Sequence, residues 1–254
     1  MKRLLFFLSA ITLFVACDSE TDPIVSEEEL NGGVTNGLVI DAKWLIEEDD
    51  RYTSFEFNDL GRYIVVCSGS SNVESSSVSF STTTTETRSS SSSILYGDYV
   101  SIDESTINMI GFGTVEVVTS DSSGVSISLT LEGESDAVEL TSAVVEQIDS
   151  TSNTDLFCRD WDFVSYTEDG VSIEETSLKG VLFSKSGTYL VEFDDEIDLA
   201  EWKWKSESNL TYYTFTGSWS SDEYVTITKL TSTELVVKEI VNGKECVTTL
   251  SYTE

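Results

Sequence analysis

Aromatic side chains are concentrated in the C-terminal half of the chain, where they could line an apolar pocket or stack on sugar rings. The candidate ligand-binding residues are Trp202, Trp204, Tyr213 and Trp219, with Trp44 and Tyr63 in related places of the first half. The same rings also suit the inside of a small β-barrel, which bulky inward side chains must fill. A packed core is therefore the favoured interpretation, and a ligand site is the alternative.

Composition argues against most catalytic and metal chemistry. The chain contains no histidine, which removes Ser-His-Asp and Cys-His catalysis and histidine metal ligands. With 46 acidic residues, no particular carboxylate pair can be singled out for glycoside hydrolysis. The acidic runs 47–50 and 194–198 lack the ordered spacing of an EF-hand loop. We therefore expect no enzyme activity, no catalytic residue, no cofactor and no metal site.

The charge balance also bears on partners. Lysine and arginine total 14, and the formal net charge is −32. Such a surface repels phosphate backbones, so nucleic acid is not an expected partner.

Three cysteines remain beyond the N-terminal region, and none belongs to a CxxC pair. Cys158 lies near the start of the first expected strand of the second half, and Cys246 lies in its last strand. Those strands are neighbours if a barrel closes, so a Cys158–Cys246 disulfide is one interpretation. Two buried thiols are the other.

The N-terminus has the layout of a secretory signal peptide over residues 1–16. Lys2 and Arg3 precede an apolar run that is too short to span a membrane. The stretch Phe14-Val15-Ala16-Cys17 resembles the lipobox of bacterial lipoproteins, which implies that Cys17 carries fatty acyl chains such as palmitate and anchors the protein to a membrane. Plain secretion with an unmodified Cys17 is the alternative.

The residues after Cys17 are polar and acidic, and residues 17–37 are expected to form a flexible tether. This acidic stretch resembles the export signal of cell-surface lipoproteins in Bacteroidota. The resemblance implies an outer-membrane lipoprotein at the cell surface, with a periplasm-facing location as the alternative.

The remainder predicts an all-β fold. Val, Ile, Thr, Tyr and Phe are abundant, and the chain has one proline. In residues 201–205 charged and aromatic residues alternate, which places both tryptophans on one face of a strand. Asn242-Gly243 predicts a tight hairpin. About eight short strands per half suit an antiparallel up-and-down barrel or a curved meander.

An internal repeat indicates two tandem domains. Residues 57–65 match 183–191 as F-x-x-x-G-x-Y-[IL]-V, with Trp44 and Trp161 upstream. Other similar residues lie 120 positions apart in the two halves, and we expect them to be equivalent. They pair residues 97–99 with 217–219, Ile107 with Ile227 and Val117 with Val237. The expected domains are 38–148, with a Ser/Thr-rich loop over 68–93, and 156–254, separated by the polar run 149–154.

These residues resemble the lipocalin-like domains of many Bacteroidota lipoproteins. The resemblance rests on Trp161, on residues 183–191, on residues 217–219 and on residues 225–237. It implies a barrel with a central cavity for a small apolar molecule. The expected function is a membrane-anchored, non-enzymatic binding lipoprotein for a small hydrophobic ligand or a glycan. The alternative is a structural or protein-interaction module of the cell envelope, with another envelope protein as its partner.

Overall fold

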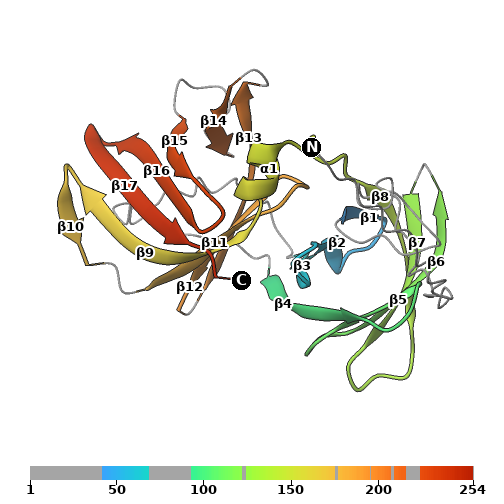
Figure 1. Ribbon diagram of the computed structural model, residues 1–254. Helices are drawn as coiled ribbons and strands as arrows, with labels where there is room; N and C mark the ends of the chain where they lie inside the picture. The colour runs from blue at the N-terminus through green and yellow to red at the C-terminus, as the bar shows by residue number, and fades with distance from the viewer. Residues whose placement is uncertain are drawn as a thin grey trace, which may run out of the picture.

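The computed structural model describes residues 42–68, 93–121, 124–174, 177–194, 196–206, 209–215 and 224–253. These residues form two β-barrels that lie side by side (Figure 1). The signal peptide, Cys17, the tether 17–37 and nearly all of the Ser/Thr-rich loop lie outside the described residues. Predictions about those segments remain predictions.

The first barrel is a closed meander in which each strand pairs antiparallel with the next, and the last with the first. Its strands are β1 (Ala42–Glu47), β2 (Tyr52–Phe57), β3 (Arg62–Cys67), β4 (Ser93–Ser101), β5 (Thr106–Met109), β6 (Gly113–Asp121), β7 (Gly124–Leu131) and β8 (Val138–Val144). Burial alternates along β7, so one set of side chains points into the barrel.

The second barrel repeats this path. Its strands are β9 (Asp160–Glu168), β11 (Leu178–Phe183), β12 (Thr188–Phe193), β13 (Ile197–Ser206), β14 (Asn209–Phe215), β15 (Val225–Leu230), β16 (Glu234–Val241) and β17 (Lys244–Ser251). Pairing of β17 with β9 closes these eight strands, and a short extra strand, β10 (Val171–Ile173), pairs with the far end of β9. The predicted all-β fold of two tandem up-and-down barrels is confirmed.

A short helix, α1 (Ser152–Phe157), precedes the second barrel, where no helix was expected. The Thr151 side chain accepts a hydrogen bond from the Thr154 backbone N–H at 3.1 Å, which caps the first turn. Phe157 is 0% exposed and belongs to the core of the second barrel. The polar run 149–154 is thus not a simple linker, because it begins a helix that packs on the domain following it.

The repeated hairpin is confirmed in register and in turn geometry. Phe57 pairs with Tyr63, and Phe183 pairs with Tyr189. Gly61 and Gly187 occupy equivalent turn positions with φ of 75° and 82°, a region that favours glycine. The hairpin β2–β3 of the first barrel is therefore equivalent to β11–β12 of the second.

The matches at an offset of 120 are wrong, because they are displaced by one strand. Asp98 of β4 pairs with Arg62 of β3, and Glu201 of β13 pairs with the equivalent residue of β12, Thr188. The residues that follow, Tyr99 and Trp202, are therefore equivalent. The Tyr99 hydroxyl donates to the Asn58 carbonyl at 2.8 Å, and Trp202 Nε1 donates to the equivalent Ser184 carbonyl at 2.9 Å. Strand patterns of period two look alike, so sequence similarity alone did not fix which strands correspond.

Candidate functional site

The aromatic candidates of the second half come together at one end of the second barrel. Trp202 and Tyr213 are buried, Trp204 is half-buried, and the two tryptophan rings lie 5.2 Å apart. As predicted from the alternation in residues 201–205, both tryptophans face the core side of β13. Trp219 lies outside the described residues.

Phe157 of α1 occupies the centre of this aromatic group. Its ring centroid lies 4.2 Å from Phe183, 4.8 Å from Trp202, 5.2 Å from Trp204 and 5.1 Å from Tyr213. These separations are those of aromatic rings in contact. The helix before the second barrel thus fills the space between these rings with an apolar side chain.

Two further hydrogen bonds fix α1 over this end of the barrel. Trp161 Nε1 donates to the Phe157 carbonyl at 3.0 Å, and Trp204 Nε1 donates to Thr154 Oγ1 at 3.3 Å. Lys185 lies 3.2 Å from Asp155 and adds an ion pair at the turn of the repeated hairpin.

The first barrel also has a packed aromatic interior, formed without a helix among the described residues. Trp44 and Tyr63 are both buried, and the Trp44 ring lies 5.1 Å from Phe57. Tyr63 stacks on Phe112 at 6.3 Å, and its hydroxyl donates to the Ile110 carbonyl at 3.2 Å. Trp44 and Tyr63 are therefore core residues of a packed barrel.

Polar groups also lie inside the second barrel. The Tyr213 hydroxyl is buried and has no hydrogen-bond partner among the described residues. Burial, with the charge of Glu239 nearby, raises the pKa of Tyr213 well above its usual value. The Tyr166 hydroxyl donates to Cys246 Sγ at 3.0 Å. Sequence reasoning missed Glu239, which is buried at an inward position of β16, in phase with Leu235 and Val237.

The disulfide interpretation is wrong, because no disulfide joins Cys158 to Cys246. Cys158 follows α1 beside the start of β9, whereas Cys246 pairs with Glu168 at the other end of that strand. Cys158 and Cys246 are therefore separated by most of the length of the paired strands β9 and β17, which rise about 3.3 Å per residue. A disulfide requires Cα atoms within about 7 Å. Sequence placed the two strands together correctly but did not fix the register.

The acidic run 47–50 borders a surface hollow of about 280 Å³. The hollow is lined by Glu47, Glu48, Asp49, Ser126, Glu139, Leu140 and Thr141. Asp49 accepts a hydrogen bond from the Arg51 side chain at 2.8 Å, and that contact lowers the Asp49 pKa. In the described part of the chain, no group of three or more His, Cys, Asp or Glu side chains is placed to hold a metal ion. Asp195 of the second acidic run lies outside that part.

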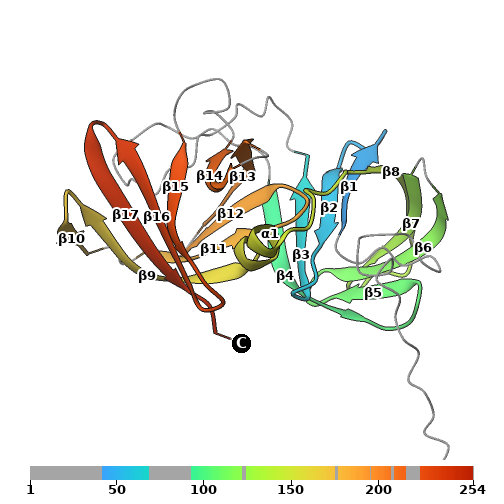
Figure 2. The same ribbon diagram turned by 45° about the horizontal axis from the view of Figure 1, so that its top comes forward.

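The barrels contact each other through equivalent outer faces. A cross-strand row on the first barrel runs through Lys43, Glu56, Ile64 and Tyr96. The equivalent row on the second barrel runs through Asp160, Leu182, Leu190 and Leu199. Ile64, Leu182 and Leu190 form an apolar cluster, against which Tyr96 and Leu199 pack. We call this contact the inter-barrel joint; Figure 2 shows β3 and β4 facing the second barrel.

The two rows cross the joint in opposite directions, as in a two-fold dimer contact. Lys43 Nζ lies 3.2 Å from Thr188 Oγ1, and the equivalent pair, Asp160 and Arg62, lies 3.3 Å apart. Lys43 and Asp160 thus hold corresponding positions with opposite charge. The joint is an intramolecular version of an isologous interface.

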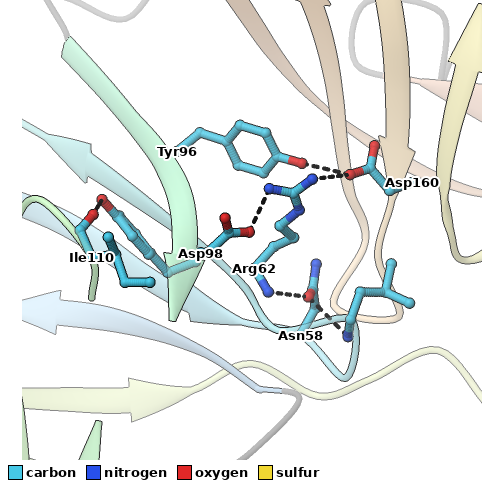
Figure 3. A network of polar contacts seen from close by, with 8 residues as sticks. Asn58, Arg62, Tyr96, Asp98, Ile110 and Asp160 are labelled. Atoms are coloured by element: carbon cyan, nitrogen blue, oxygen red, sulfur yellow. Dashed lines mark hydrogen bonds and ion pairs between the residues drawn. The ribbon is translucent and has the colours of Figure 1, made fainter. Parts of the chain in front are cut away.

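An Arg62-centred network closes one edge of the joint (Figure 3). Arg62 Nη1 bonds to Asp98 at 2.5 Å, and Nη2 lies 3.3 Å from Asp160 across the joint. The Tyr96 hydroxyl donates to the same Asp160 carboxylate at 2.9 Å. Burial and Asp160 together raise the pKa of Tyr96, so it stays protonated and acts as a donor.

Comparison with protein-family models, with curated proteins and with solved structures finds no match for the chain. The described residues include no helix with the length and apolar character needed to cross a membrane. Function must therefore be argued from the geometry of this chain alone.

Proposed function

We propose that the protein is a non-enzymatic interaction module of the bacterial cell envelope. The observation that carries the proposal is the insertion of Phe157 among Trp202, Trp204 and Tyr213, which occupies the expected ligand site with the protein's own side chain. A filled barrel presents its outer surface and loops rather than a cavity. The apolar joint holds the two barrels as one unit for that purpose.

The anchor belongs to the same proposal. Signal peptidase would release residues 1–16, acyl chains on Cys17 would hold the protein to the outer membrane, and residues 17–37 would tether it at the cell surface. Metabolic labelling with an alkyne fatty acid tests the anchor: the wild-type chain should be labelled and Cys17→Ser should not. Protease treatment of intact cells then separates a surface location from a periplasmic one.

A second candidate, a binding protein for a small apolar molecule or a glycan, is supported by one observation. The buried Tyr213 hydroxyl has no partner among the described residues, and Glu239 lies near enough to influence its titration. A ligand with a hydrogen-bonding group could satisfy that hydroxyl, since an unpaired buried polar group is costly.

Native mass spectrometry of the protein recovered from its host distinguishes the two candidates. The interaction module predicts a mass equal to that of the acylated chain alone, unchanged after exposure to host lipid and glycan extracts. The binding protein predicts an additional adduct that is lost on denaturation and weakened in Tyr213→Phe. Such an adduct would overturn the first proposal and identify the class of ligand.

A further inference from the structure

Glu56 is the one carboxylate of the two matched rows that is buried within the joint. It is 3% exposed and sits where the pseudo-two-fold arrangement places Leu182 on the other barrel. It pairs across strands with Ile64, a member of the apolar cluster. The first barrel therefore has a buried carboxyl group at the row position where the second barrel has an aliphatic side chain.

The groups that face Glu56 come from both barrels. Lys43 of β1 donates to Thr188 Oγ1, and Thr188 donates through a short hydrogen bond to Glu56 Oε2. Ser184 also bonds to this carboxyl, and Glu201 of β13 adds a like charge nearby. Glu56 Oε1 is buried without a hydrogen-bond partner among the described residues. Lys43 thus reaches Glu56 by hydrogen bonding only through the Thr188 hydroxyl, although its charge also favours the carboxylate.

These surroundings disfavour the charged carboxylate. Burial is the largest effect, and it raises the pKa of Glu56 above its usual value in spite of Lys43. When the barrels separate, water reaches the carboxyl and the pKa returns toward about 4.3. The docked arrangement therefore binds the proton more tightly than the separated one. Docking is favoured at low pH and weakens as pH rises through the pKa of the docked state.

We propose that the inter-barrel joint is a pH-sensitive contact, in which a protonated Glu56 holds the barrels together and its ionisation loosens them. The device is independent of what the barrels bind. It would change how the two barrels present their surfaces while leaving each barrel folded.

Small-angle X-ray scattering of the full chain carrying Cys17→Ser, recorded from pH 5 to pH 9, tests the proposal. The radius of gyration of this protein should rise with pH, with a midpoint above the ordinary range of a glutamate. Glu56→Leu copies Leu182 and should remove the rise, keeping the molecule compact throughout. Glu56→Gln keeps the shape of the protonated carboxyl and should also remove it.

Glu116→Gln on β6 is the matched control, because it removes an exposed carboxylate and should keep the full rise. A radius of gyration that does not change with pH in the Glu56-containing chain would overturn the proposal. An equal rise in Glu56→Leu would also overturn it, since some other group would then control the joint.

Discussion

The two barrels share a frame but differ in how they are filled. Where the first barrel has Ser101 paired with Ile107, the second has Trp204 paired with Tyr213. Only the second barrel has α1 among the described residues, and Phe157 packs between the larger rings. The repeated hairpin and the first-strand tryptophan are thus common to both barrels. The side chains that fill each interior differ, because residues at a few inward strand positions differ in size.

The largest expected effect comes from Phe157, the residue of α1 that packs in the core of the second barrel. Phe157→Ala removes a fully buried ring in contact with four others and should lower the free energy of unfolding by about 3–5 kcal/mol. Urea denaturation followed by tryptophan fluorescence measures this loss. Ser152→Ala, an exposed change in the same helix, should stay within about 0.5 kcal/mol. A small loss in Phe157→Ala would mean that the helix contributes little to the second barrel.

The shared turn should respond alike in both barrels. Gly61→Ala and Gly187→Ala each place a side chain at positive φ, at a cost of about 1–2 kcal/mol. A Cβ at Gly187 would lie 3.3 Å from the Trp202 carbonyl oxygen, against 3.9 Å from that of Tyr99 for Gly61. Urea denaturation should therefore show the larger loss for Gly187→Ala. A clearly larger loss for Gly61→Ala would contradict the proposed equivalence of the turns.

The first-strand tryptophans should differ, although both are fully buried. Trp161→Phe leaves the Phe157 carbonyl without its donor, whereas Trp44 Nε1 has no partner among the described residues. Trp161→Phe should therefore destabilise the protein by about 1 kcal/mol more than Trp44→Phe. Paired denaturation curves measure the difference, and equal losses would show that the indole bond to α1 is energetically minor.

The smallest expected effect concerns the cysteines, whose predicted difference is in the rate of alkylation and not in the free energy of unfolding. In the folded protein Cys67, half-buried, should react with a thiol reagent before Cys158 and Cys246, which are buried. After denaturation without a reductant, intact mass should show all three alkylated. Two unreactive thiols would instead restore the disulfide interpretation.

Sequence predicted the fold through features of short range. The F-x-x-x-G-x-Y pattern defines a hairpin whose glycine must adopt positive φ, and the alternation in residues 201–205 fixes which side chains of β13 point inward. Those features depend on neighbouring residues and needed no knowledge of the whole barrel.

Features that depend on register and on long-range packing were not predicted. The positions of Cys158 and Cys246 along β9 and β17, and the equivalence of Tyr99 with Trp202, follow from strand registers that a period-two pattern cannot fix. The burial of Glu56 was not predicted, because strand alternation places it on the outer face of β2, between the core residues Phe55 and Phe57. In the structure Glu56 is buried and accepts a hydrogen bond from Thr188 of the second barrel.

The isologous joint also has a consequence for the protein at high concentration. A head-to-tail contact between repeats would leave one unsatisfied copy of the face at each end of the chain, ready to recruit another molecule and grow a filament. Here each face covers the other within a single polypeptide. While the barrels are docked, neighbouring molecules therefore meet no vacant copy of this face among the described residues, and assembly cannot propagate through it.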